Sequence, residues 1–186
     1  MTTQQLTGRL LVATPILGDP NFDRTVVLVL EHSDDGAVGL VLNRPSDTEV
    51  AEPLPEWDDV AAVPSVIFVG GPVSQSAVIG LARSGAAGTA YAGWREVGGG
   101  IAIVDLAEGR PDGALAVDSL RLFAGYAGWG PFQLEAEIDA GAWWVVDAAP
   151  DDALSPDPER LWTSVLRRQR SRLAMHAHFP DDPSAN

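Results

Sequence analysis

The amino-acid sequence predicts an α+β fold in a single domain. Its 186 residues are the length of one ordinary domain. Seven apolar runs have the length and composition of strands, whereas two or three segments have helical features, and the two kinds do not alternate as in βαβ proteins. We expect a disordered N-terminus at 1–7, the domain at 8–170 and a C-terminal tail at 171–186.

A β-hairpin is expected to form the centre of the core. Two apolar runs, Val26–Leu30 and Val38–Leu42, flank a polar turn that contains Asp35-Gly36. An Asp-Gly step favours a tight turn because Gly adopts positive φ without strain. Neither run alternates apolar with polar residues, so we expect other structure to cover both faces of the hairpin.

Five further strands are predicted from short apolar runs bounded by Gly, Pro or polar residues. They are Gly8–Ala13, Ser65–Val69, Val78–Leu81, Ile101–Asp105 and Ala142–Val146. The Ala/Gly-rich residues 83–93 are expected to form a surface loop.

Two or three helices are predicted. Apolar residues recur at helical spacing within 112–127; they are Ala116, Leu120, Phe123 and Ala127. A short helix is expected at Pro131–Ile138. Another begins at Asp157-Pro158, where Asp serves as N-cap and Pro occupies the first helical position.

Composition excludes several classes of chemistry. The chain has no Cys, and all 12 of its basic residues are Arg, which excludes disulfides, thiolate nucleophiles, Schiff-base lysines and the P-loop lysine. We find neither a signal peptide nor an apolar stretch long enough to span a membrane, so we expect a cytoplasmic protein. No cofactor is expected.

Catalytic and metal motifs are missing or incomplete. No Ser lies in a G-x-S-x-G elbow. Asp19, Asn21 and Asp23 have the spacing of a calcium loop, but Arg24 and Leu30 stand where its Gly and bidentate Glu belong. Three His without an H-E-x-x-H pattern do not indicate a metal centre. We therefore expect no catalytic residue and no metal site.

Two further groups could be drawn as acid–base sets. His32 is close in sequence to Ser33 and Asp34, but neighbouring side chains on a turn point in different directions, so we expect an exposed histidine. Glu135 and Glu137 do not share a helix face, and we expect them to be solvated or to make structural hydrogen bonds.

An arginine-rich segment contrasts with the acidic remainder. The chain has a net charge of −14, and residues 160–172 hold five Arg and no acid; without these five, 7 Arg face 26 acids, a net charge of −19. The five are Arg160, Arg167, Arg168, Arg170 and Arg172. They could contact RNA or an acidic protein, or pair with the protein's own acids. The overall charge opposes direct DNA binding.

Several motifs occur in a fixed order over most of residues 8–166. They are GRLLVATPILGDPNFDRTVVLVLEH, GAVGLVLNRPS, FVGGPV, FAGYAGWGPFQLEAEI with AWW, and a later LW pair. In this combination the sequence resembles the AlgH/YqgE family of bacterial proteins, which implies a flattened β-barrel with helices packed around it. The family is largely uncharacterised and is labelled a regulator of gene expression. Phe132 stands where the family usually has Gly, and neither 83–93 nor the Arg-rich tail belongs to the shared pattern.

The family motifs gather polar residues among apolar ones. These are Asn21, Arg24, Asn43, Arg44, Gln133 and Glu137. They could satisfy buried backbone groups of an irregular barrel, or they could form a pocket for a small ligand. We therefore expect a non-enzymatic binding protein with a regulatory role, acting through a protein or RNA partner. The alternative is a small-molecule binding protein, such as a nucleotide-binding one, or a hydrolase that uses this pocket.

Overall fold

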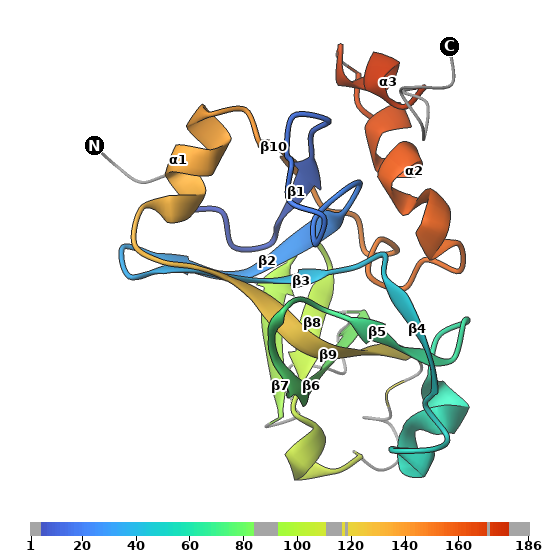
Figure 1. Ribbon diagram of the computed structural model, residues 1–186. Coiled ribbons are helices and arrows are strands. Elements are labelled where there is room, and N and C mark those ends of the chain that lie inside the picture. Colours follow the sequence, from blue (N-terminus) through green and yellow to red (C-terminus); the bar gives the residue numbers. More distant parts are fainter. Residues whose placement is uncertain (1–4, 84–92, 111–116, 118, 171, 179–186) are drawn as a thin grey trace.

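The computed structural model describes residues 5–83, 93–110, 117, 119–170 and 172–178 (Figure 1). Within them it has ten strands and a few short helices. The strands are β1 Arg9–Ala13, β2 Val26–Ser33, β3 Gly36–Val41, β4 Pro45–Glu49, β5 Val66–Val69, β6 Val73–Arg83, β7 Trp94–Gly98, β8 Ile101–Val104, β9 Leu120–Trp129 and β10 Trp143–Asp147. The α-helices are α1 Gln133–Asp139, α2 Leu161–Arg167 and α3 Leu173–His176, and the 3₁₀ turns are η1 Pro55–Val60, η3 Leu106–Glu108 and η5 Pro158–Arg160. The predicted α+β class is confirmed, as are the central hairpin and the five other strands.

The strands form one curled sheet in the order β10-β1-β2-β3-β9-β6-β8-β7, with antiparallel neighbours throughout. Strand β9 lies in the middle of this order. Its end at Ala127–Trp129 pairs with β3, and its earlier part pairs with β6 on one side and, in parallel, with β5 on the other. β4 pairs with β5. Because β9 exchanges partners along its length, the sheet bends there.

The sheet curls into a half-barrel, so that residues beside β1 and β10 approach residues beside β7, at the other end of the strand order. A Cβ atom on Gly8, just before β1, would lie 2.7 Å from the carbonyl oxygen of Val97 in β7. Likewise, a Cβ on Gly100, which has a φ of +75°, would lie 2.6 Å from Pro150. Only residues without side chains permit these approaches.

The central hairpin is covered on both faces, as its continuous apolar runs predict. In β2, Leu28 and Leu30 face the main core between the sheet and α2, whereas Val27 and Val29 face a second core beneath α1. Successive strand residues point to opposite faces, so each core receives every second residue. A fully buried Val or Leu contributes about 1.5–3 kcal/mol, which makes this hairpin a large share of the hydrophobic stabilisation. A third core surrounds Trp57 of η1.

The helix predicted at 112–127 is wrong over its described part, because residues from Leu120 onwards form strand β9. Leu120 and Leu122 face the third core and Phe123 faces the main core, so both sides of the segment are apolar. The recurrence that suggested a helix arises because β9 is buried at most positions on both of its faces, and pairing with three strands decides its conformation. Ala116 lies outside the described residues, as does most of the loop expected at 83–93.

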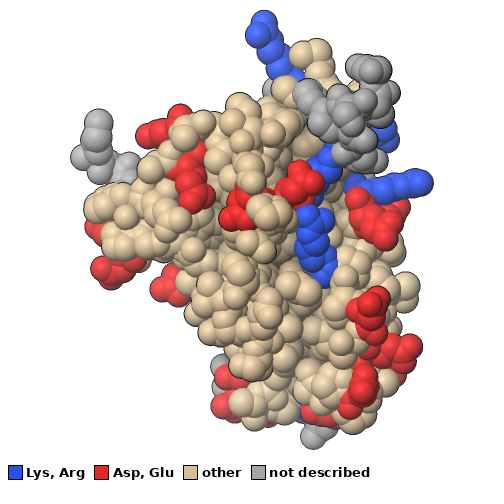
Figure 2. Space-filling model, viewed as in Figure 1, with Lys and Arg blue, Asp and Glu red and all other residues tan. Residues whose placement is uncertain are grey.

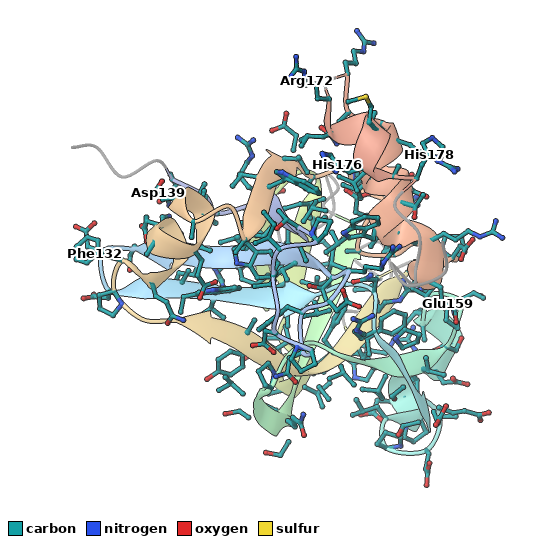
Figure 3. The ribbon with its side chains drawn as sticks, turned by 45° about the horizontal axis from the view of Figure 1, so that its top comes forward. Phe132, Asp139, Glu159, Arg172, His176 and His178 are labelled. Carbon is teal, nitrogen blue, oxygen red and sulfur yellow. The ribbon has the colours of Figure 1, made fainter. Side chains whose placement is uncertain are left out.

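The predicted short helix near Pro131 is α1, and the residue before it is unusual. Phe132 has a φ of +59°, in the left-handed region that favours Gly, and its ring is exposed (Figure 3). The backbone conformation there explains why the family usually places Gly at this position. A non-Gly residue in that region costs about 1–2 kcal/mol.

The C-terminal helices pack against the sheet through α2. This helix begins through the 3₁₀ turn η5 at Pro158, as the Asp-Pro pair predicts, but the Asp157 side chain makes no capping hydrogen bond. Trp162, which is buried, donates through its indole N–H to the carbonyl oxygen of Ala13, 2.9 Å away. α3 follows within the segment expected to be a tail, and the nearby Ala177 is buried. Among the described residues no helix has the length and apolar character needed to cross a membrane.

Candidate functional site

A groove of about 290 Å³ opens on the half-barrel. We call it the Arg44 groove. It is lined by Pro20, Asn21, Val41, Arg44, Pro45, Val69, Gly71, Pro72 and Gln75. Three segments that are distant in the sequence therefore meet there: the loop before β2, the β3–β4 connection, and the β5–β6 connection.

The loop before β2 is fixed from two directions. The carboxylate of Asp19 accepts hydrogen bonds from the backbone N–H of Asn21 at 2.9 Å and from its side-chain amide at 3.0 Å. The next residue, Phe22, packs against Trp129 and Trp143 with ring centroids 6.3 and 5.5 Å away. Asn21 is thus held at the groove by an aromatic anchor on its other side.

Asn43 is buried and ties β3 to the same loop. Its Oδ1 accepts from the backbone N–H of Val26 at 2.9 Å, and its Nδ2 donates to the carbonyl oxygen of Arg24 at 2.9 Å. Arg24 has a φ of +50°, and its guanidinium lies 4.8 Å from the centre of the Trp162 ring. Asn43 and Arg24 support the wall of the groove and do not line it.

Among the described residues that line this groove, Arg44 is the single charged one. Its guanidinium donates to the carbonyl oxygen of Asp23, and its own carbonyl accepts from the backbone N–H of Val69 at 2.8 Å. The side chain is half-buried, and its described partner is a neutral carbonyl group. A positive charge without a bound carboxylate therefore lies in the groove of a protein whose net charge is −14.

The opposite wall contains a tight backbone approach. A Cβ on Gly71 would lie 2.1 Å from the carbonyl carbon of Tyr126, so this position requires Gly. Ser74, in the same wall segment, has a φ of +47°. Of the three described non-Gly residues with positive φ, Arg24 and Ser74 lie in segments that adjoin the groove, although neither lines it. Strain of this kind clusters at ligand sites and costs about 1–3 kcal/mol per residue.

Gln133 and Glu137 lie away from the groove lining, on α1. One carboxylate oxygen of Glu137 accepts from the indole N–H groups of Trp129 and Trp143 at 2.9 and 2.8 Å. Its other oxygen accepts from the Gln133 amide at 3.0 Å, and the Gln133 carbonyl accepts from the backbone N–H of Gly130 at 3.0 Å. The structure thus brings four of the six predicted residues together at the groove or behind its wall. The remaining two attach α1 to the aromatic cluster.

The histidine expected to be exposed is buried, so that prediction is wrong. His32 is 4% exposed; its Nε2 lies 2.9 Å from a carboxylate oxygen of Glu135, and its Nδ1 accepts from the backbone N–H of Leu6 at 3.3 Å. β2 continues to Ser33, beyond the apolar run, and α1 covers the strand there. Among the described residues no group of three or more His, Asp or Glu side chains is placed to hold a metal ion.

Sequence reasoning missed Arg121, which is buried in β9. Its guanidinium donates to the carbonyl oxygens of Val63 at 2.6 Å, Ser155 at 2.8 Å and Ala153 at 3.3 Å, and it lies 4.3 Å from the Phe68 ring. Burial lowers the pKa of Arg121 to about 10, so it remains a cation at neutral pH. The available signal was an Arg inside an apolar run, at a position where a charge requires partners.

The Arg-rich segment divides into paired and unpaired residues. Arg168 makes a bidentate pair with the buried Asp152 at 2.5 and 2.6 Å, and Arg160 lies 3.6 Å from Asp157. Three others are exposed and have no carboxylate partner among the described residues; they are Arg167, Arg170 and Arg172. Basic side chains gather in the upper half of the face shown in Figure 2, whereas acidic ones extend from top to bottom.

Fold and groove together define a class: an α+β half-barrel with one basic groove and no recognisable catalytic centre among the described residues. The chain belongs to the AlgH-like family, whose profile matches residues 10–174. A UPF0301 protein of Streptomyces coelicolor is 57% identical over 185 residues, which cover 97% of this chain and 95% of that protein. One from Thermobifida fusca is 46% identical over 195 residues, covering 100% and 98%.

Two solved structures have the same fold. A crystal structure of a Corynebacterium diphtheriae protein is 31% identical with a TM-score of 0.86, and the match covers 95% of this chain and 94% of that one. The solution structure of AlgH from Pseudomonas aeruginosa is also 31% identical, with a TM-score of 0.68 and coverage of 98% of both chains. The resemblance noted in the sequence is confirmed; the family's function is uncharacterised.

Proposed function

We propose that this protein is a non-enzymatic binding protein whose Arg44 groove takes a small anionic molecule. The observation that carries the proposal is the charge of the groove. Arg44 contributes a half-buried cation, and none of the other described residues in the lining is Asp or Glu. In a protein with 26 acids and 12 Arg, a concave site without an acidic side chain selects for an anion.

The size and the walls of the groove narrow the ligand class. A volume of about 290 Å³ lies at the small end of ligand sites, which hold roughly 300–1,000 Å³. Three prolines in the lining restrict backbone motion, so the site is largely pre-formed and little ordering is needed on binding. The guanidinium of Arg44 fits a carboxylate or phosphate oxygen pair. Asn21 and Gln75 add amide groups for a polar part of the ligand.

The lining favours binding over hydrolysis. Its described residues include no Ser, His, Asp or Glu that could act as nucleophile or general base. A regulatory role in gene expression would follow if ligand binding changed how the protein interacts with a partner in the cytoplasm, without direct contact with DNA.

Native mass spectrometry of gently purified protein, followed by thermal-shift titration, tests this proposal. The titrants are inorganic phosphate, benzoate and adenosine monophosphate, with benzamide and adenosine as neutral counterparts. At least one anion should raise the melting temperature of the wild type, while its neutral counterpart does not. Arg44→Gln should abolish the shift. Arg95→Gln, which removes an exposed Arg from β7, should preserve it and is the matched control.

Two results would contradict the proposal. One is an equal shift in wild type and Arg44→Gln. The other is a clean native mass together with no shift from any of the titrants.

A further inference from the structure

Three arginines at the turn between α2 and α3 stand apart from most of the others. Arg9, Arg83, Arg110, Arg160 and Arg168 each form an ion pair with an Asp. Arg167, Arg170 and Arg172 are exposed and have no carboxylate partner among the described residues. Figure 3 shows Arg172 directed away from the body of the protein, at the end of the molecule formed by the two helices. We call these three the turn arginines.

An exposed methionine accompanies this charge. Met175, on α3, is 66% exposed, which makes it one of the most exposed large apolar side chains of the described chain. Its thioether is flexible and polarisable, and such side chains are common at protein-binding surfaces. The turn therefore combines cations with an apolar contact.

Both helices are fixed beneath the turn, so they present these side chains from a rigid base. Leu161, Trp162, Val165 and Leu166 of α2 are buried. Next to Met175, the His176 ring lies 4.7 Å from the Trp144 ring of β10. Arg168, within the turn itself, is held by Asp152 and by the carbonyl oxygen of Asp147 at 2.9 Å.

We propose that the turn arginines and Met175 form a surface that binds an acidic segment of a partner protein carrying an apolar residue. The surface is separate from the Arg44 groove, and the proposal does not depend on the groove's ligand. At physiological salt the Debye length is about 8 Å, so a docked segment experiences these local cations more than the distant acids.

Charge and chemistry favour a polypeptide over a nucleic acid. Binding through a nucleic-acid backbone gains its affinity from the number of phosphates that are neutralised, and this surface offers only three cations among its defining residues. Among the residues that define it, none is aromatic, so it lacks the stacking platform on which single-stranded RNA depends. A protein segment can offer an apolar side chain to Met175, whereas a phosphate backbone cannot.

Fluorescence anisotropy with the full-length protein tests this surface. The probe is a labelled peptide of Glu with interspersed Leu residues, and a single-stranded RNA of equal charge is measured in parallel. The peptide should bind the wild type. The triple variant Arg167→Gln/Arg170→Gln/Arg172→Gln should lower the affinity for the peptide about tenfold and make that affinity less dependent on salt. The matched control, Arg9→Gln/Arg83→Gln/Arg110→Gln, reaches the same net charge and should keep the affinity. Circular dichroism verifies the fold of both.

Met175→Gln separates the apolar contribution from the charge. This variant should lower the affinity for the peptide several-fold and leave the salt dependence of binding unchanged. The proposal is overturned if the peptide fails to bind, if both triple variants lose affinity equally, or if Met175→Gln has no effect. Tighter binding of the RNA, lost in the turn variant, would overturn the assignment of a protein partner.

Discussion

The carboxylate of Glu137 accepts the indole N–H of Trp143 at 2.8 Å, and the same oxygen accepts from Trp129. One charged group thereby joins α1 to strands β9 and β10. The aromatic rings that it holds also pack against Phe22, the anchor of the loop at the Arg44 groove.

Replacing Glu137 should therefore destabilise the whole protein. In Glu137→Ala the indole donors lose a charged acceptor, and we expect a loss of about 2–4 kcal/mol in the free energy of unfolding. Glu137→Gln should lose less free energy of unfolding, because its carbonyl oxygen can still accept from the indole N–H groups. It should still lose some, because its amide then faces the Gln133 amide, which is also a donor. Urea denaturation followed by tryptophan fluorescence measures both, with the exposed Glu159→Gln of η5 as control (Figure 3). Equal stability of Glu137→Ala and the control would show that the network contributes nothing.

Arg121 should behave as a structural cation. Arg121→Met leaves the carbonyl oxygens that its guanidinium serves without a donor, and Arg121→Lys cannot reach all of them with one ammonium group. We expect each to lose about 2–4 kcal/mol. The pKa of Arg121, about 10 in the fold, stays far above 7, so Arg121 binds its proton in both folded and unfolded states. By linkage, the difference from wild type should not change between pH 6 and 8. Chemical denaturation across that range measures it, and a pH-dependent difference would contradict this assignment.

Asn43 should control the loop at the groove. Asn43→Asp removes the amide that donates to the Arg24 carbonyl and places a carboxylate against it. We expect a loss of about 1–3 kcal/mol and faster hydrogen exchange at Thr25 and Val26. Mass-spectrometric exchange of the peptide that spans this loop gives the readout. Asn21→Asp, at an exposed position of the same loop, is the comparison; similar exchange in both variants would remove the role assigned to Asn43.

His32 should be a single tautomer when neutral. Because its Nδ1 accepts from the Leu6 N–H, the proton must reside on Nε2, which donates to Glu135. Long-range ¹H–¹⁵N correlation spectra at neutral pH should show an unprotonated Nδ1. A protonated Nδ1 would mean that the N-terminal segment is not attached in this way.

Local patterns predicted seven of the ten described strands but neither β4 nor β7, and they predicted a helix in place of β9. The hairpin is buried on both faces, so its sequence is continuously apolar, and that signal does not depend on knowing its partners. The prediction for β9 was wrong because a segment that is buried on both faces also has apolar residues at helical spacing. The pairing of Phe123 with β5 and β6 decides the outcome and is remote in the sequence.

The candidate site was predictable only in part. Asn21 and Arg44 reach the groove because short loops connect them to strands that the sequence reveals. Gln133 and Glu137 belong to the same family motifs, yet α1 turns them towards Trp129 and Trp143. The burial of His32 was likewise invisible locally, since it depends on Glu135, more than a hundred residues away.

Strand β9 is shared by both arms of the half-barrel, and this restricts how the protein can come apart. β3 with its neighbours and β6 with its neighbours pair with the same ten-residue segment. Neither arm can open fully without giving up hydrogen bonds to that common strand. The sheet should therefore behave as one foldon, with the slowest-exchanging amides in the middle of β9 and no partly unfolded form that retains a single arm.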